Sequence, residues 1–184
     1  MLAFSIFVSG SFTFGSLIAN EISPELLTFY RFLIATIILG VILYFNKSIY
    51  AHHLKNIWRY FVLGAIYSIY FVFMFVALKY TTTVSTAAIF TLLPLFAALL
   101  ERLFLKKSSP VLIWAALILS GMGALWIIFE GSINGLFQFR FEEGEAIFLV
   151  GTICYASYAI IQPKLFEGEN IYVTTLGVLA AGSI

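Results

Sequence analysis

The sequence predicts an all-α, polytopic membrane protein with six complete transmembrane helices and a truncated seventh. Two observations carry this prediction. The chain is 62% hydrophobic and only 10% charged, whereas a soluble globular domain is about half apolar and a quarter charged. The apolar residues also form blocks that recur along all 184 residues. A block of about 20 residues, at about 1.5 Å of rise each, matches the roughly 30 Å hydrocarbon core of a bilayer.

The first three predicted spans begin with recognisable signals. The first, Met1–Ala19, is rich in serine and glycine, which let neighbouring helices approach closely in lipid. The second, Pro24–Phe45, opens with a proline at the first helical position, where proline is tolerated. The third, Ile57–Leu78, carries Trp58 and Tyr60 near its start, as expected of an aromatic belt at the membrane interface.

The fourth span lies within the stretch Ala77–Lys107, whose run from Val84 to Leu100 contains no charged side chain. Pro94 stands in the middle of this run and removes one backbone hydrogen bond, which frees the carbonyl of Phe90. The proline predicts a helix kink that serves as a hinge. The alternative is a proline without a gating role, since prolines are common in transmembrane helices.

Three further apolar blocks complete the chain. The fifth span is Val111–Phe129, and the sixth is Glu145–Gln162, which we expect to stop at Pro163. The last block, Ile171–Ile184, has 14 residues and is too short to cross a bilayer.

The loops between the spans differ in their content of lysine and arginine. One set of alternate loops contains two, Lys79 and Arg140. The positive-inside rule places the richer set in the cytoplasm, and the N-terminus with it. We therefore expect a multi-pass protein of a cell membrane, the inner membrane in a bacterium. The richer set contains seven: Lys47, Lys55, Arg59, Arg102, Lys106, Lys107 and Lys164.

A weak internal repeat predicts the domain organisation. An offset of about 146 residues places Phe148–Ile161 on Leu2–Gly15, and both segments interleave aromatic and small residues. The predicted domains are a five-helix repeat over residues 1–130, an extracytoplasmic loop over 131–144 and the start of a second repeat over 145–184. A unit with an odd number of spans would be followed by an inverted copy, an arrangement that recurs in transporters.

Several short motifs, in this order and spacing, resemble the EamA-type unit of the drug/metabolite transporter superfamily. Two positions depart from that pattern: Ser9-Gly10 stands where the family often has Trp-Gly, and Lys106-Lys107 where it often has Gly-Glu. The motifs that carry the resemblance are Ser23-Pro24, Tyr30-Arg31-Phe32, Ala77-Leu78-Lys79-Tyr80-Thr81-Thr82, Leu92-Leu93-Pro94-Leu95-Phe96, Leu103-Phe104-Leu105, Gly144-Glu145 and Ile153-Cys154-Tyr155-Ala156.

The resemblance implies a secondary transporter that exports small metabolites, such as amino acids, by alternating access. It also implies a central cavity lined by helices of both repeats. A full member has ten helices, so the chain is interpreted as an N-terminal fragment. Missing C-terminal helices or a second copy would then be needed to complete the cavity.

Arg31 is the one charged residue well inside the second span. A charge at membrane depth is costly and usually faces the bundle interior or a water-filled cavity. Arg31 is therefore a candidate for a cation that faces the substrate or a gate. The alternative is a structural role, in which the side chain reaches the outer interface or pairs with Glu21 or Glu25.

Hydroxyl groups and aromatic rings supply the remaining candidates. A pocket for a neutral or zwitterionic metabolite needs hydroxyls and aromatic faces with few charges. Tyrosines three positions apart share a face in the third and sixth spans, and threonines add hydroxyls in the fourth. Each of these residues is also explained by packing alone. The candidates are Tyr67, Tyr70, Thr86, Thr91, Tyr155 and Tyr158.

Two other classes of membrane protein stay open as alternatives. A small multidrug-resistance exporter works as a dimer of four-helix chains and relies on a membrane-embedded glutamate in its first helix. The first acid here, Glu21, lies at the helix end. A non-transport subunit or scaffold of the membrane is the other alternative.

The composition also argues against several functions. A net charge of +1 offers no basic field for nucleic acid. The chain has no aspartate, and its two histidines, His52 and His53, are adjacent with no third ligand near them. We therefore expect no enzymatic activity, no cofactor and no metal site, and the partners we expect are the lipid bilayer and a small-molecule substrate.

Overall fold

The structure is a computed structural model that describes residues 2–45, 57–106, 110–129, 131 and 142–184. The described residues are helical and contain no β-strand. Residues 46–56, which include His52 and His53, and most of the predicted loop over residues 131–144 lie outside the described part. The helices are α1 (Leu2–Ile18), α2 (Pro24–Phe45), α3 (Ile57–Ala77), α4 (Thr83–Phe90), α5 (Leu93–Leu105), α6 (Val111–Ile128), α8 (Glu143–Leu165) and α9 (Ile171–Gly182).

Five of the described spans are long and apolar enough to cross a membrane. They are α2, α3, the pair α4–α5 taken together, α6 and α8. The helix α1, with 17 residues, and α9, with 12, are shorter. The polytopic character is therefore confirmed, whereas the count of six complete spans stays a prediction.

The fourth predicted span is divided into two helices at Thr91 and Leu92. The Leu92 N–H donates to the carbonyl of Ile89 at 2.9 Å, so the chain tightens before α5 begins. Pro94 lies in the first turn of α5, where its missing N–H would otherwise be unpaired. The uncharged run from Val84 to Leu100 is thus continuous in composition but not in its helical hydrogen bonds.

The sixth predicted span extends two or three residues beyond both expected ends. At its start, the Glu145 side chain accepts a hydrogen bond from the Glu142 N–H at 3.1 Å, and the Glu142 side chain caps the first turn of α8 in return. At its end, the expected stop at Pro163 is wrong, because α8 continues to Leu165. Pro163 is tolerated there because only two residues of the helix follow it, so a single hydrogen bond is lost in its last turn.

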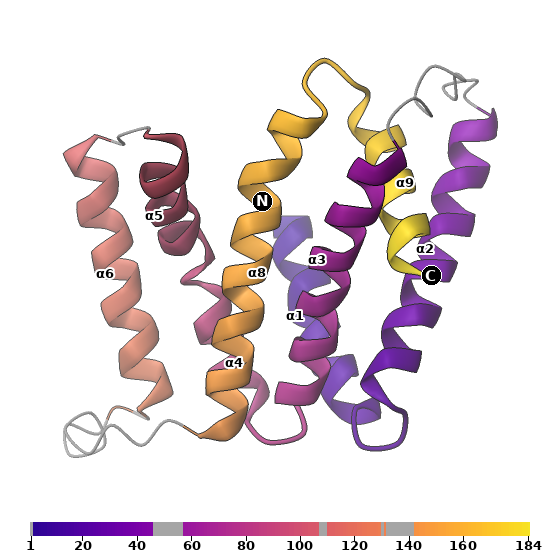
Figure 1. Ribbon diagram of the computed structural model, residues 1–184. Helices are drawn as coiled ribbons and strands as arrows, with labels where there is room; N and C mark the ends of the chain where they lie inside the picture. The colour runs from indigo at the N-terminus through magenta and orange to yellow at the C-terminus, as the bar shows by residue number, and fades with distance from the viewer. Residues whose placement is uncertain (1, 46–56, 107–109, 130, 132–141) are drawn as a thin grey trace.

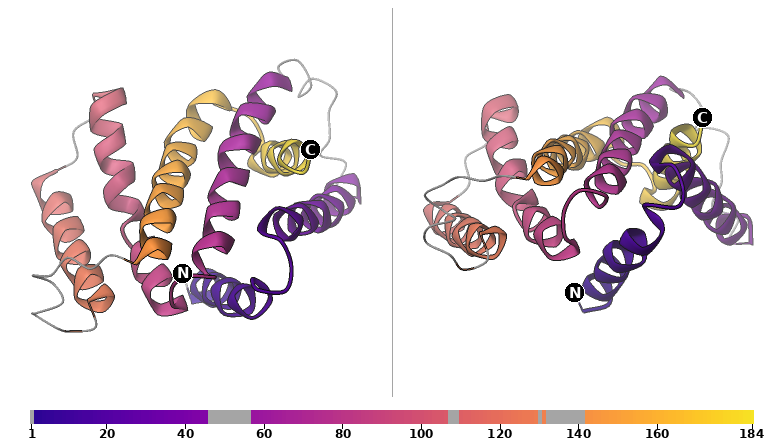
Figure 2. Two further views of the ribbon diagram at one scale, coloured as in Figure 1. Left: turned by 60° about the horizontal axis from the view of Figure 1, so that its bottom comes forward. Right: turned by 90° about the horizontal axis from the view of Figure 1, so that it is seen from below.

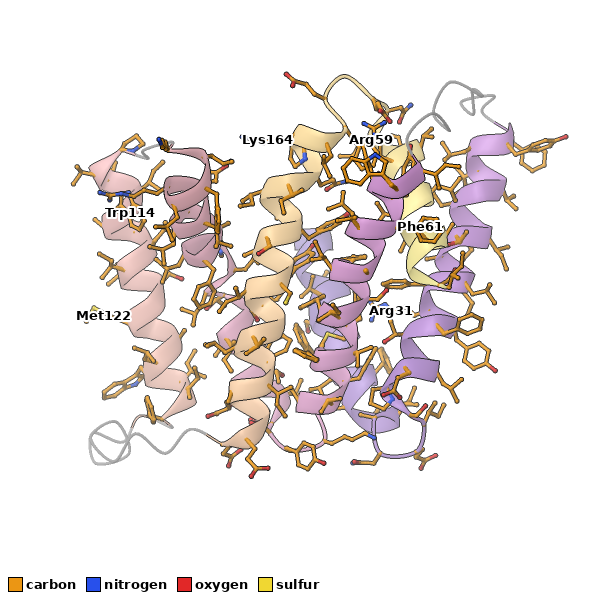
Figure 3. The ribbon with its side chains drawn as sticks, viewed as in Figure 1. Arg31, Arg59, Phe61, Trp114, Met122 and Lys164 are labelled. Atoms are coloured by element: carbon orange, nitrogen blue, oxygen red, sulfur yellow. The ribbon has the colours of Figure 1, made fainter. Side chains whose placement is uncertain are left out.

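The helices alternate in direction along the chain, as Figure 1 shows. Successive long helices run up and down, so α1 and α8 point in opposite directions, and so do α2 and α9. An inverted repeat requires opposite directions for these pairs; the repeat itself stays a prediction. Arg59 and Lys164 lie at the same end of the bundle (Figure 3).

The helices α3 and α8 form the centre of the bundle. α8 packs against α3, α4 and α5, and α9 fits between α3 and α2. Seen from below, the helices form a curved row with α6 at one end and α2 at the other, and α1 lies to one side of that row (Figure 2).

Glycines allow the backbones of the central helices to approach each other closely. A Cβ at Gly64 of α3 would lie 2.8 Å from the backbone nitrogen of Gly182 in α9, and one at Gly144 of α8 would lie 2.8 Å from the carbonyl oxygen of Ala77. Only glycine fits at these two positions without a shift of backbone. Such contacts are the usual basis of helix association in lipid. We call the contact of α3 with α8 and α9 the packed seam.

Candidate functional site

A cavity of about 180 Å³ lies between α1, α2, α3, α4 and α8. We call it the central cavity. Its wall is mostly aromatic, with one charged side chain and a few hydroxyl groups. The residues that line it are Val8, Ser11, Phe12, Arg31, Tyr67, Tyr70, Phe71, Met74, Phe90 and Tyr155.

Arg31 reaches this cavity from α2. Its Nη1 donates a hydrogen bond to Ser11 Oγ at 2.8 Å, and its guanidinium carbon lies 4.5 Å from the centre of the Phe71 ring. A cation over an aromatic face is held by the ring quadrupole. Figure 3 shows Arg31 between α2 and α3, well away from both ends of the bundle. Among the described residues, no carboxylate, including Glu21 and Glu25, forms an ion pair with Arg31.

Arg31 also borders a second hollow of about 680 Å³, which is open and almost entirely apolar. We call it the outer groove; it lies between α1 and α2 and against α3. Arg31 and Ser11 line both hollows, so the guanidinium stands where the cavity meets the groove. The side chain is consequently exposed, although protein surrounds much of its length. The other groove residues are Ile6, Gly10, Phe14, Gly15, Ile18, Leu27, Tyr30, Ile34 and Phe75.

Four tyrosines from α3 and α8 stack beside the cavity. Tyr67 and Tyr70 share one face of α3, and Tyr155 and Tyr158 share the opposing face of α8. The ring centres of Tyr70 and Tyr155 are 4.6 Å apart, and those of Tyr67 and Tyr158 are 4.7 Å apart. Phe32 of α2 stacks on the other side of Tyr67, at 5.4 Å. The spacing of three residues in each helix thus produces one continuous aromatic layer.

The structure brings four of the predicted site residues to one cavity and leaves three elsewhere. Arg31, Tyr67, Tyr70 and Tyr155 line the central cavity. Tyr158 is absent from that lining and packs behind Tyr67 and Tyr155 in a core with Tyr60 and Phe166. The remaining two residues, Thr86 and Thr91, belong to the fourth span.

The two threonines hydrogen-bond within their own helix. Thr86 is buried, and its hydroxyl donates to the carbonyl of Thr83 at 2.9 Å. The Thr91 hydroxyl donates to the carbonyl of Ala88 at 2.6 Å and lines a different, apolar hollow with Thr13 and Val84. Neither hydroxyl belongs to the lining of the central cavity.

Sequence reasoning missed the phenylalanines of the cavity wall. Phe12, Phe71 and Phe90 line it, with Met74. Phe12 connects two other rings, since it packs edge-on against Phe90 and against Phe148, with ring centres 5.8 Å apart in both pairs. Phe71 follows Tyr67 by four residues, so the shared helix face was a usable signal. With 20 phenylalanines in the chain, however, the sequence gives no means of choosing among them.

A second arginine forms an ion-paired cluster at the end of the bundle that carries Lys164. Arg59 Nη2 lies 2.8 Å from Glu169 Oε1, and Arg59 Nη1 donates to the carbonyl of Leu165. The guanidinium carbon lies 4.8 Å from the centre of the Phe166 ring, and Tyr60 donates to the other Glu169 oxygen at 3.4 Å. We call this the Arg59 cluster; it joins the start of α3 to the turn between α8 and α9.

Within the described part of the chain, no group of three or more potential metal ligands comes together. The acids at the start of α8 serve as helix caps, and Glu169 belongs to the Arg59 cluster. The central cavity therefore offers a guanidinium, hydroxyls and aromatic faces as its means of binding.

The chain is similar to several curated proteins described as uncharacterized transporters. It is 30% identical over 186 residues to the transporter YyaM of Bacillus subtilis, covering all of this chain and 61% of the relative. It is 26% identical to a transporter of Archaeoglobus fulgidus, covering all of this chain and 63% of the relative. The chain thus spans about three-fifths of the length of these relatives. No solved structure matches it.

A family model matches most of the chain. The model is that of the EamA-like transporter family, and it matches residues 1–129, which contain α1 to α6. This confirms the resemblance drawn from the motifs around Arg31 and Pro94. The chain therefore belongs to the EamA-like transporter family.

Proposed function

We propose that the chain is part of a secondary transporter that exports small metabolites, such as amino acids, by alternating access. The observation that carries this proposal is the central cavity, which is bounded by five helices and contains a lone guanidinium at membrane depth. Residues that bear charge inside a membrane usually mark a substrate or ion pathway. The family and the transporter-named relatives support transport in general.

Alternating access needs a mobile element that moves relative to a rigid group of helices. The packed seam supplies a rigid part, because Gly64 and Gly144 hold three helices backbone to backbone. The break at Thr91 and Leu92 supplies a hinge, because few hydrogen bonds join α4 to α5 across it. In this proposal α4 bears Phe90 of the cavity wall and swings about Pro94.

The longer relatives supply the rest of the proposed assembly. Further C-terminal helices, or a second copy of the chain, close the outer groove and complete the cavity. The transporter lies in a cell membrane, the inner membrane in a bacterium. In this proposal the end of the bundle that carries Arg59 and Lys164, labelled in Figure 3, faces the cytoplasm together with the N-terminus, as the positive-inside rule predicts.

Uptake and efflux measurements in sealed vesicles test this proposal. Vesicles containing the 184-residue chain, or a version completed with the C-terminal helices of a longer relative, are loaded with labelled amino acids and related metabolites. We expect efflux above that of empty vesicles for at least one compound. Pro94→Ala should slow that efflux while leaving binding of the same compound unchanged, because it removes the proline ring that keeps α4 and α5 apart and so favours one stiffer, continuous helix across Thr91 and Leu92. If no compound moves in either preparation, the non-transport alternative replaces this proposal.

A further inference from the structure

The guanidinium of Arg31 has hydrogen-bond donors to spare. An arginine offers five N–H donors in a planar fork, and among the described residues a single hydrogen bond, to Ser11 Oγ, uses one of them. The contact with Phe71 occupies a face of the guanidinium and none of its donors. The fork therefore stays free to bind a pair of acceptor atoms on a ligand.

The charge of Arg31 is also unbalanced within the cavity. None of the lining residues is acidic, and no described carboxylate forms an ion pair with Arg31. In a site that is mostly apolar, an uncompensated cation favours an anionic ligand and disfavours a cationic one. Carboxylates match the fork of arginine with two parallel hydrogen bonds.

The other residues of the cavity wall indicate the size and polarity of the rest of the ligand. Phe12, Phe71, Phe90 and Tyr155 present rings to a space of about 180 Å³. Cavities of about 150 Å³ hold a benzene ring, so one ring with a short side chain fills this one. The free hydroxyl groups of the lining are too few to replace the water around a sugar or a polyol.

We propose that Arg31 is the anchor of a carboxylate subsite, and that the substrate is an organic monocarboxylate with a compact apolar or aromatic body. This inference rests on the proposed function, because it names the substrate class of the same cavity. The carboxylate lies against the Arg31 fork beside Ser11, and the body lies among the rings of Phe12, Phe71 and Phe90.

An anionic lipid headgroup is the other chemistry that could pair with Arg31. Arg31 stands seven residues into α2, about 10 Å along its axis at 1.5 Å per residue. Headgroups lie at the interface, outside the hydrocarbon core. The central cavity extends from Arg31 to Tyr67, Tyr70 and Tyr155, which are buried or half-buried between α3 and α8, so a small diffusible carboxylate fits the position better.

Equilibrium dialysis with radiolabelled 3-phenylpropionate tests this inference on the purified 184-residue chain in detergent. Unlabelled 3-phenylpropionate, 3-phenylpropionamide, 3-phenylpropylamine and dioleoylphosphatidylglycerol serve as competitors. We expect saturable binding, competition by the carboxylate, and competition that is at least about tenfold weaker for the amide and the amine, which lack the paired charge. Effective competition by the phospholipid would assign Arg31 to the headgroup and overturn the inference.

Variants then connect the binding to Arg31. Arg31→Gln should weaken binding of 3-phenylpropionate by about tenfold or more, and Arg31→Lys should weaken it less, since the charge remains but the fork is lost. Arg102→Gln is the matched control, because Arg102 lies over Trp114 at the end of α5, outside the cavity. Size-exclusion profiles verify that each variant is folded.

Three results would overturn the carboxylate subsite: no saturable binding of 3-phenylpropionate, equal competition by the amide, or wild-type affinity in Arg31→Gln. The wild-type competition series needs no variant, so a folding defect cannot hide the answer. The proposed function fails separately. If a neutral or cationic compound leaves the vesicles at the same rate in wild type and in Arg31→Gln, the protein is a transporter but the proposed carboxylate subsite is wrong. If 3-phenylpropionate binds in an Arg31-dependent manner but no compound is exported, the subsite is supported and the proposed transport function is wrong.

Discussion

Arg31 and Arg59 differ in how completely neighbouring groups balance the charge of the guanidinium. Arg59 has a carboxylate, a carbonyl and an aromatic face around it, and its side chain is 15% exposed. Arg31 has one serine hydroxyl and one ring, and it stands at the junction of a cavity and a groove. An arginine that is paired with a carboxylate joins elements of the fold, whereas one without a counter-charge at membrane depth is available for a ligand.

The same contrast extends to the helices around them. The packed seam has backbone contacts at Gly64 and Gly144 that admit only glycine. The α1–α2 side near Arg31 has an open hollow and exposed apolar side chains such as Phe14 and Ile34. The tightest backbone packing is therefore in the seam, whereas the α1–α2 side of the cavity is open; Tyr67, Tyr70 and Tyr155 belong to the seam and also line the cavity.

Gly64→Val should have the largest effect on stability. The new side chain would meet the Gly182 nitrogen and the Val178 carbonyl, which are backbone atoms that cannot rotate away. We expect a loss of about 3 kcal/mol in the free energy of unfolding, the upper range for overpacking, measured by denaturant titration in mixed micelles. Gly123→Ala is the control: a Cβ there meets nothing within 4 Å, so it should stabilise α6 by about 0.5 to 1 kcal/mol. If Gly64→Val is as stable as wild type, the close packing of α3 on α9 does not stabilise the fold as we infer.

Glu169→Gln should have the next largest effect. It leaves the Arg59 guanidinium without its counter-charge in a partly buried site, and hydrogen bonds to charged groups contribute about 1.5 to 3 kcal/mol. We expect a loss of about 2 kcal/mol in the same titration, and a double-mutant cycle with Arg59→Gln should show coupling of more than about 0.5 kcal/mol. Glu167→Gln, an exposed neighbour in the same turn, should change stability little. Additive effects of the two cluster variants would mean that the pair does not act as a unit.

Arg31→Gln should change stability by about 1 kcal/mol or less. The variant loses one hydrogen bond and one cation–π contact but also relieves the cost of holding a charge at membrane depth. Arg59→Gln, measured in parallel, should cost more. If the order of the two arginine variants is reversed, Arg31 is structural and the contrast between the two sites disappears.

Ser11→Ala and Ser68→Ala form the smallest and most closely matched pair. Ser11 accepts from Arg31 at 2.8 Å, and Ser68 donates to the Gly182 carbonyl at 2.9 Å in the packed seam. Side-chain hydrogen bonds between membrane helices average about 0.6 kcal/mol, so we expect similar small losses of stability. Only Ser11→Ala should also weaken 3-phenylpropionate binding, by about threefold, since that is the equivalent of the same free energy. An effect of Ser68→Ala on binding would show that the seam and the cavity are coupled.

Most helix boundaries could be predicted from the sequence because the length of a membrane span is set by a contiguous run of apolar residues. The expected span Pro24–Phe45 coincides with α2, and the third and fifth spans end within one residue of α3 and α6. The capping signal missed at Glu142 and the tolerated Pro163 moved the ends of α8 by two or three residues. A run of apolar residues predicts where the chain crosses, while caps decide the last turn.

The site was predictable in its parts and not in its assembly. The spacing of Tyr67 and Tyr70 gave the face they share, but only the packing of α3 on α8 shows that Tyr155 meets it. Thr86 and Thr91 were chosen for their hydroxyls, yet a threonine in a helix readily bonds its own carbonyls. The pairing of Arg59 with Glu169 joins the start of α3 to a turn 110 residues further along the chain, so no local pattern could reveal it.

The packed seam has a consequence for how the protein is made. Tyr155 follows Tyr67 by 88 residues, so α3 leaves the ribosome long before α8 exists to cover it. At about 5 to 20 residues per second, the delay is roughly 4 to 18 s. During that interval the tyrosine face of α3 can contact only the helices made before α8 and the insertion machinery. A photo-crosslinker at residue 67 in ribosome-bound chains of increasing length should label translocon or insertase components first and α8 last.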